Sequence, residues 1–210
     1  GTSVFNQGYS KSAWWLKLQL ENSSDESLPR LLEVGYAALD HVDVFVLHND
    51  VLQQHFVMGD KLPYAQRPVD HRFFMAPITL MPHQMLDVYV RVQSSGAVQA
   101  PLTLWEYGQF HSSNFTATIL QGLYYGGILT IAIYNLLIFF VLGDRNYLYY
   151  VAFMLCTMMT LAAQSGLAFR FLWPDATTWN DLAIVFFTAA TAGFAAIFPL
   201  MDWIFGTIYM

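Results

Sequence analysis

The sequence predicts an all-β N-terminal domain, a β-sandwich of jelly-roll or immunoglobulin-like type, followed by an α-helical transmembrane region of three helices. Three observations lead to this fold class. Apolar and polar residues alternate with a period of two in the first half of the chain, which is typical of half-buried strands. An uncharged run of 24 residues follows, long enough to cross a bilayer. Charged residues, finally, are concentrated in the first half.

Composition separates the two halves. Hydrophobic residues make up 56% of the chain and charged residues 11%, against roughly 25% charged in an average soluble domain. Residues 1–118 contain seven of the nine Lys and Arg, eleven of the fifteen Asp and Glu, and all six His. The first half therefore has the composition of a water-soluble domain and the second that of a membrane region. The mildly acidic first half argues against a nucleic-acid partner.

The sandwich domain is expected over residues 1–110. Alternation is clearest in five stretches, which we predict to be strands: 14–20, 31–36, 42–47, 73–80 and 86–92. Turn-forming Ser, Asn, Asp and Gly separate them. A polar linker is expected over residues 111–118. Because this linker contains no Pro, it could extend the first membrane helix outward as a stiff connection.

Three spans are predicted within residues 119–210, at about 119–142, 147–169 and 182–201. At 1.5 Å per residue the first span measures about 36 Å, enough for a hydrocarbon core of about 30 Å. The turn at 143–146 carries one Arg and one Asp, whereas the connection at 170–181 carries one Arg and two Asp. The positive-inside rule favours the first turn as cytoplasmic, which places the N-terminal domain outside.

Patterns of common catalytic and cofactor sites do not occur in the sequence. It contains neither a dinucleotide fingerprint nor a P-loop, and no GxSxG elbow. The six His are scattered, and none has the spacing of HExxH or HxxxH. We therefore expect no enzyme activity, no catalytic residue, no cofactor and no metal.

One candidate ligand site lies in the first predicted strand. Trp15 shares the polar face of this strand with Lys17 and Gln19. A Trp among polar neighbours can stack on a sugar ring or another planar ligand face, and can attract a cation. The alternative is that this face packs against another strand or a loop.

A second candidate is the long connection from Gly59 to Phe74. Arg is suited to bidentate recognition of a carboxylate, and loops on a sandwich commonly bind ligands. The alternative is that its arginines pair with Asp60 or Asp70. The candidate binding residues of this connection are Tyr64, Arg67, His71 and Arg72.

Long ordered stretches also resemble a known family. GYSKSAWWLKLQLEN, LLEVGYAALDHVDVFV, GDKLPYAQRPVDHRFFMAPI and YVRVQSSGAVQAPLTLW resemble the extracellular sensory domain of bacterial seven-transmembrane receptors with diverse intracellular signalling modules. LQGLYYGGILTIAIYNLLIFFVLGDRNYLYYVAFM resembles the start of their seven-helix region. The resemblance covers about residues 6–198.

This resemblance implies a jelly-roll domain similar to carbohydrate-binding modules, in the periplasm, on a multi-pass protein of the bacterial inner membrane. It implies a small-molecule ligand, a carbohydrate or a small carboxylate. The expected partners are the lipid bilayer and a cytoplasmic output module such as a histidine kinase or diguanylate cyclase, and a homodimer is a candidate assembly. Trp15, Arg67, Arg72, Ser94 and Ser95 fall in the recurrent motif segments of the family, which adds both serines to the candidate binding residues.

Two features depart from the family pattern. The chain carries three of the seven helices and no output domain, so we expect it to be the truncated input portion of a receptor. The atypical tail, 199–210, resembles the C-terminal segment of membrane fatty-acid hydroxylases and sterol desaturases. Those enzymes need His-rich metal boxes, and residues 119–210 contain no His, which argues against that activity.

The predicted function is ligand sensing for a signal-transduction receptor, with a periplasmic domain coupled to membrane helices. The alternative is a membrane-anchored carbohydrate-binding or protein-contact module without signalling. Three helices are more than an anchor needs, which favours the receptor.

Overall fold

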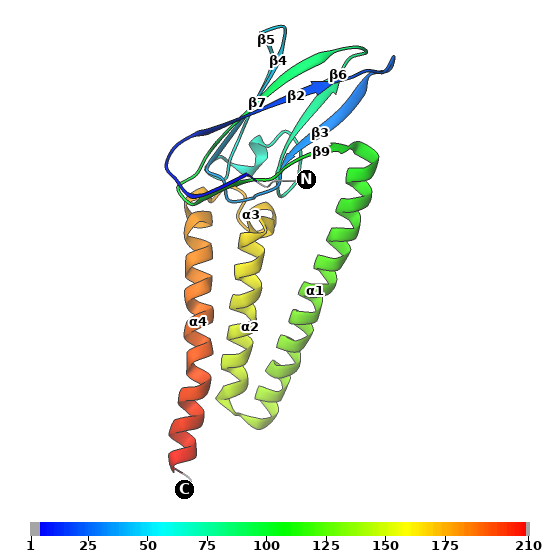
Figure 1. Cartoon of the computed structure of the whole chain (residues 1–210). Coiled ribbons are helices and arrows are strands. Elements are labelled where there is room, and N and C mark those ends of the chain that lie inside the picture. The colour runs from blue at the N-terminus through cyan, green and yellow to red at the C-terminus, as the bar shows by residue number, and fades with distance from the viewer. Residues whose placement is uncertain (1–4, 209–210) are drawn as a thin grey trace. The chain divides into compact units, whose positions relative to one another are not determined.

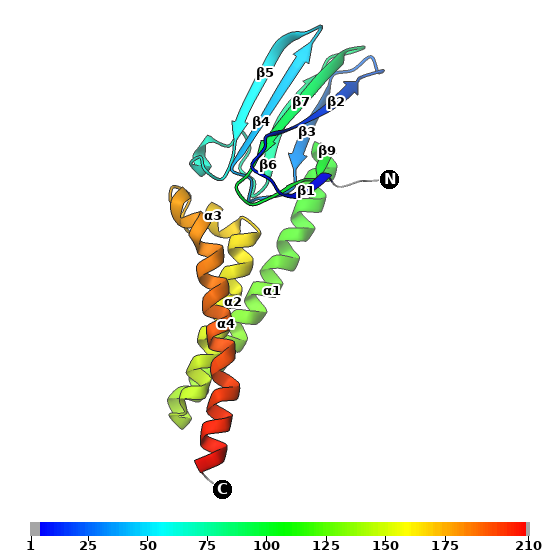
Figure 2. The same ribbon diagram turned by 60° about the vertical axis from the view of Figure 1, so that its left-hand side comes forward.

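The computed structural model describes residues 5–208, with side chains as far as residue 197. In this part of the chain, strands form the N-terminal domain and helices follow (Figures 1 and 2). The strands are β1 (Phe5–Tyr9), β2 (Trp14–Glu21), β3 (Leu28–Val34), β4 (His41–His48), β5 (Val51–Met58), β6 (Phe74–Leu80), β7 (Met85–Gln93), β8 (Ala97–Ala100) and β9 (Leu102–Glu106). The helices are the 3-10 turn η1 (Tyr64–Gln66), α1 (Tyr107–Leu142), α2 (Arg145–Gln164), α3 (Leu167–Phe171) and α4 (Thr177–Ile208).

The strands form three antiparallel sheets, ordered β2-β7-β4-β5, β6-β3-β9 and β1-β8. Figure 2 shows the first two as layers of one domain. Buried side chains from both belong to a single hydrophobic core, with Val44 and Val90 from the first sheet and Val34 and Ile78 from the second. This arrangement confirms the predicted β-sandwich. The jelly-roll type stays a prediction.

Period-two alternation located five of the strands that have one face in this core, but not the short strand β8, whose Val98 and Ala100 also lie in it. All five predicted stretches are strands, β2, β3, β4, β6 and β7, and their ends differ from the prediction by at most three residues. The sequence analysis missed β5 because most of its residues are exposed on both faces. Without a buried face, an edge strand has no alternation to detect.

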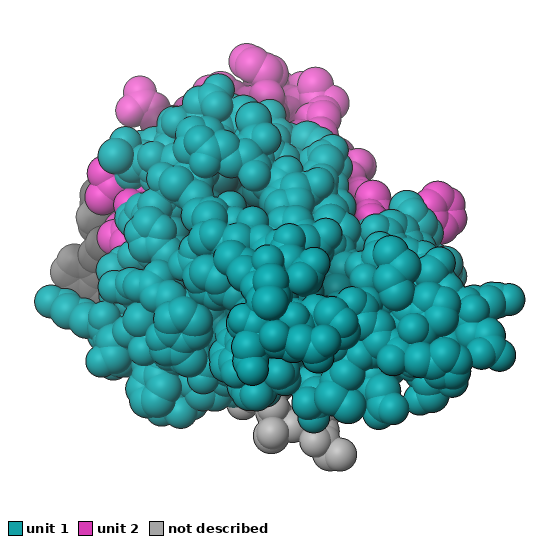
Figure 3. All heavy atoms as spheres, turned by 90° about the horizontal axis from the view of Figure 1, so that it is seen from above, with its two compact units in different colours: residues 1–113, 165–180 teal, residues 114–164, 181–210 magenta. Residues whose placement is uncertain are grey.

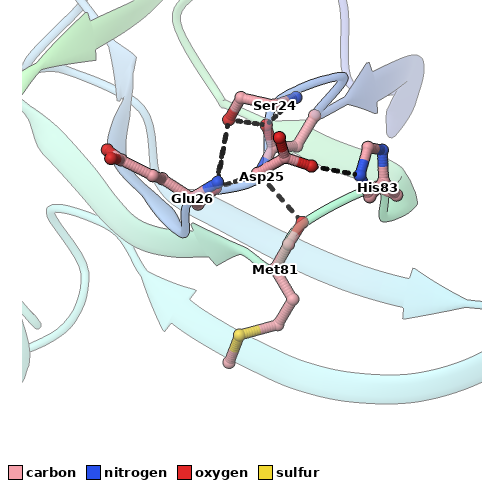
Figure 4. Close-up of polar contacts among 6 residues, drawn as sticks. Ser24, Asp25, Glu26, Met81 and His83 are labelled. Atoms are coloured by element: carbon pink, nitrogen blue, oxygen red, sulfur yellow. Dashed lines mark hydrogen bonds and ion pairs between the residues drawn. The ribbon is translucent and has the colours of Figure 1, made fainter.

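A buried asparagine ties two turns of the sandwich together. The Asn22 amide nitrogen donates to the backbone oxygens of Glu26, Leu80 and Met81, at 2.7, 3.2 and 2.9 Å. The same two turns are joined by a second contact. Figure 4 shows the His83 ring next to the Asp25 carboxylate, and the distance between His83 Nε2 and Asp25 Oδ1 is 2.8 Å. The turn after β2 is therefore joined to the turn after β6 by side chains as well as by the core.

Three helices of the described chain are long and apolar enough to cross a membrane: 107–142, 145–164 and 177–197. This confirms the predicted helical region. Helix α1 begins at Tyr107 and runs through the predicted linker, 111–118, as the absence of Pro there allowed. Helix α4 begins at Thr177, five residues before the predicted start of the third span.

Helix α2 ends at Gln164, whereas the second span was predicted to continue to Phe169. Gly166 follows with a φ of +75°, in the left-handed region where a glycine commonly ends a helix. Phe169 is 1% exposed and packs within the β-domain's compact unit. Hydropathy predicted a longer span because an apolar residue buried in protein has the same hydropathy as one buried in lipid.

The chain divides into two compact units, coloured separately in Figure 3. One consists of residues 1–113 and 165–180, and the other of residues 114–164 and 181–210. We call residues 165–180 the connecting segment, because they join the second span to the third. This segment belongs to the same compact unit as the β-domain.

Candidate ligand-binding site

The first predicted site lies on the outer face of the β2-β7-β4-β5 sheet. Apolar residues of β2, such as Trp14 and Leu16, pack against the core, so the residues between them point outward. The pairing of β2 with β7 sets Lys17 opposite Tyr89, and the pairing of β7 with β4 sets Tyr89 opposite Phe45. Since the pairing of β4 with β5 also sets Phe45 opposite His55, register brings outward-facing side chains from four strands together.

Three rings on this face form what we call the aromatic strip: Trp15, Phe45 and His55. Trp15 and Phe45 are stacked with their centres 5.7 Å apart, and Phe45 and His55 with theirs 4.1 Å apart. Trp15 remains 56% exposed. An exposed aromatic surface of this kind can stack on the apolar face of a ligand ring.

Polar and charged groups flank the aromatic strip. Lys17 pairs with Asp87 at 3.3 Å and lies over the Tyr89 ring, 5.2 Å from its centre. Hydrogen bonds to Tyr89 and Asp87 raise the pKa of the Lys17 ammonium. Arg91 pairs with Asp43 at 3.0 Å. The face therefore offers ring surfaces next to donors and acceptors, the combination that orients a small polar ligand.

The second predicted site comprises residues 59–74, which we call the Arg67 loop. Whereas Lys17 and Arg91 on the sheet face pair with carboxylates, Arg67 lies among aromatic rings. The Arg67 guanidinium carbon lies 4.6 Å from the ring centres of Tyr64 and Phe74 and 5.6 Å from that of Phe169. Its Nη1 donates to the carbonyl oxygens of His71 and Arg72, at 3.0 and 2.8 Å. Arg67 thus fastens its own loop.

Asp70 pairs with an arginine far away in the sequence. Its carboxylate accepts a hydrogen bond of 2.8 Å from the Tyr64 hydroxyl and one of 3.0 Å from Arg170 of the connecting segment. The Tyr64 hydrogen bond, followed by that from Arg170, lowers the pKa of Asp70. Burial and the same hydrogen bond raise the pKa of Tyr64.

Burial also lowers the pKa of the Arg67 guanidinium, to about 10, so Arg67 stays charged at neutral pH. The remaining candidates of this loop lie beside it. His71 is buried, with its ring centre 5.2 Å from that of Phe110. Arg72 lies over the Phe73 ring, 4.7 Å from its centre. The loop therefore uses its aromatic and cationic side chains mainly in contacts with one another.

Ser94 and Ser95 lie in the turn between β7 and β8. Ser94 is buried, and its hydroxyl is 3.3 Å from the Ala38 carbonyl oxygen. The backbone N–H of Ser95 donates to the Asp40 carboxylate at 2.9 Å. These contacts hold the turn against the chain before β4.

The structure thus divides the eight candidate residues among three places rather than gathering them in one site. Sequence reasoning missed Phe45, His55 and Tyr89, which complete the outer face around Trp15 and Lys17. The sequence offered one indication of them: Phe45 and Tyr89 lie between the apolar, core-facing residues of their strands, which places their side chains on the outer face. Among the side chains that the structure describes, residues 5–197, no cluster of three or more His, Cys, Asp or Glu could hold a metal ion.

Comparison with known proteins places the chain in a family. Residues 1–106 match the model described as 7TMR-DISM extracellular 2, and residues 117–201 match the model described as 7TM diverse intracellular signalling. No curated protein gives a match. Both models describe parts of receptors rather than enzymes. The first covers half of the 210 residues by itself, and so the chain belongs to the family of seven-transmembrane receptors with diverse intracellular signalling, of which it contains an extracellular domain and membrane helices.

Proposed function

We propose that this receptor input portion senses a small molecule, and that the ligand binds on the aromatic strip of the β-domain. The stacked rings of Trp15, Phe45 and His55, with Trp15 and His55 exposed and Phe45 half-buried between them, are the observation that carries the proposal. The C–H face of a pyranose fits such a surface, and its hydroxyls match the flanking donors and acceptors. A small carboxylate is the second ligand class, because Lys17 and Arg91 already bind carboxylates beside the rings, those of Asp87 and Asp43.

Signalling requires that the ligand bind two packings of the receptor with different affinity. We propose that the remaining partner is a cytoplasmic output module, such as a histidine kinase or a diguanylate cyclase. We also propose that the protein lies in a bacterial inner membrane with the β-domain in the periplasm. The domain's extracellular family and the charges of the two connections support this orientation.

The test is a thermal-shift screen of the whole chain in lipid nanodiscs. The probes are glucose, maltose, N-acetylglucosamine, succinate and citrate. A probe at 100 times its dissociation constant should add about 2.7 kcal/mol to the free energy of unfolding. Trp15→Ala and Phe45→Ala should each weaken binding of that probe about tenfold, because they remove a stacking surface.

Tyr9→Ala is the matched control, since Tyr9 is 88% exposed and belongs to the separate β1-β8 sheet. It should leave the shift unchanged. The proposal is overturned if no probe stabilises the folded chain, or if the shift survives unchanged in both Trp15→Ala and Phe45→Ala.

A protein-contact function is the second candidate, and strand β5 favours it. This strand ends the β2-β7-β4-β5 sheet, and its sequence VLQQHFVM contains no Lys, Arg, Asp, Glu or Pro. Such residues usually protect an edge from pairing with another chain. The candidate partner is a second copy of this chain, paired edge to edge as a homodimer. Light scattering in nanodiscs should then show dimers that Val57→Lys dissociates.

A further inference from the structure

The connecting segment is built to pack against protein. Within it, the backbone N–H of Arg170 donates to Gly166, that of Leu172 to Ala168, and that of Ala176 to Trp173. The Trp173 indole nitrogen donates to the Asn180 side chain at 3.1 Å. The segment is therefore a small folded element rather than an open loop between two spans.

Its contacts with the Arg67 loop are close and specific. A Cβ on Gly166 would lie 2.8 Å from the Ala37 Cβ and 3.0 Å from the Arg72 carbonyl oxygen. The Tyr64 backbone N–H donates to the Pro174 carbonyl oxygen at 2.9 Å. Phe169 meets the Tyr64 ring edge-on, with 6.0 Å between the ring centres.

These contacts differ in strength. The Asp70–Arg170 pair is exposed on the Asp70 side, where 74% of the side chain is open to solvent, so solvent screens it. Burial of Phe169 and the absence of a side chain at Gly166 are the larger contributions, because they depend on apolar area and close approach. Gly166 is thus a sensitive position at which to separate the two surfaces.

We propose that the Arg67 loop is the docking surface for the connecting segment, and that this docking transmits changes in the β-domain to the second and third spans. Helix α2 ends where the segment begins, and α4 continues from its end, so both helices are covalently attached to it. The transmission rests on the ligand-sensing function proposed above, whereas the docking can be tested without any ligand.

The first measurement is hydrogen exchange of the Tyr64 amide in the whole chain in nanodiscs, since this amide donates across the interface. Gly166→Ala should speed its exchange about tenfold. Gly143→Ala is the matched control: Gly143 has a φ of +70°, close to the +75° of Gly166, but nothing lies within 4 Å of its Cβ position. Gly143→Ala should cost the same backbone strain as Gly166→Ala but create no steric clash, and it should leave the Tyr64 amide protected from exchange.

A milder pair of variants covers the case in which Gly166→Ala fails to fold. Asp70→Asn should speed Tyr64 exchange about twofold, and the charge-swapped double variant Asp70→Arg with Arg170→Asp should restore part of the protection. Asp25→Asn, which removes the charge from the Asp25–His83 contact of Figure 4, should have no effect. Equal Tyr64 exchange in the Gly166 and Gly143 variants, or in Asp70→Asn and wild type, overturns the docking.

Transmission is read in the second span. Cys156 lies in α2 and is the one cysteine of the chain, so a trifluoromethyl label reports on that helix by fluorine NMR. Gly166→Ala should shift the label's resonance, and Asp25→Asn should not. Faster Tyr64 exchange with an unshifted label means that the contact is passive, which overturns transmission. Neither result touches ligand binding at the aromatic strip, which the thermal-shift screen tests separately.

Discussion

The outer face of the β2-β7-β4-β5 sheet and the Arg67 loop contain the same kinds of side chain, but they use them in opposite ways. On the sheet face, Trp15 stacks on Phe45 and still leaves more than half of its surface exposed. In the loop, Arg67 lies among three rings and donates to two carbonyl groups. Aromatic rings beside cations therefore indicate a binding surface only where tertiary contacts leave a face uncovered.

The largest expected difference concerns burial in the connecting segment. Phe169→Ala should lower the free energy of unfolding of the β-domain unit by about 3–5 kcal/mol, because it leaves a cavity under Tyr64 and Arg67. Phe171→Ala, in the same helix but 66% exposed, should cost under about 1 kcal/mol. Urea unfolding in nonionic micelles, followed by near-ultraviolet circular dichroism, measures both. Equal losses would mean that Phe169 is not buried against the loop.

Two adjacent tryptophans sharpen the comparison on the sheet. Trp14 packs against the core and meets Phe5 edge-on, so Trp14→Ala should cost about 2–4 kcal/mol. Trp15→Ala should cost under about 1 kcal/mol, because its outer face is already in water. The same unfolding experiment decides, and a larger loss for Trp15→Ala would identify Trp15 as a packing residue rather than a binding one.

The two arginines give a smaller difference. Arg67→Lys should cost about 1–3 kcal/mol, because an ammonium cannot reproduce two directed hydrogen bonds and ring stacking in a buried place. Arg91→Lys on the sheet face should cost under about 1 kcal/mol. The lysine ammonium can still reach Asp43, and the pair is partly exposed, so solvent already weakens it. Melting curves of the two variants test whether Arg67→Lys is the more destabilising change. A lower melting temperature for Arg91→Lys would contradict this prediction.

The smallest expected effect is the acid sensitivity of the docking. The pKa of Asp70 is lowered in the folded chain, so the carboxylate stabilises the interface above its ordinary pKa of about 4 and loses this contribution as the pH falls below that value. Exchange of the Tyr64 amide, corrected for its intrinsic pH dependence, should rise more steeply below pH 4 in wild type than in Asp70→Asn. Parallel pH profiles of the two proteins would mean that the Asp70 carboxylate does not stabilise the interface.

The candidate residues show how far the sequence alone could lead. Trp15 and Lys17 were placed on an outward face by alternation, a local property that the strand geometry preserves. Phe45 and His55 could not be assigned to the same surface, because they come from β4 and β5 and reach it only through strand register. The role of Asp70 was equally out of reach, since its partner Arg170 lies 100 residues away.

The sequence by itself determined the division into a β-sandwich and membrane helices, five strands with one buried face, and the approximate positions of three spans. Each of these depends on composition or on a short-range period. Tertiary structure alone decided which aromatic and cationic side chains stay open, and that residues 165–169 pack with the β-domain instead of continuing the second span. The physical reason is that burial in lipid and burial in protein favour the same apolar residues, so only the contacts distinguish them.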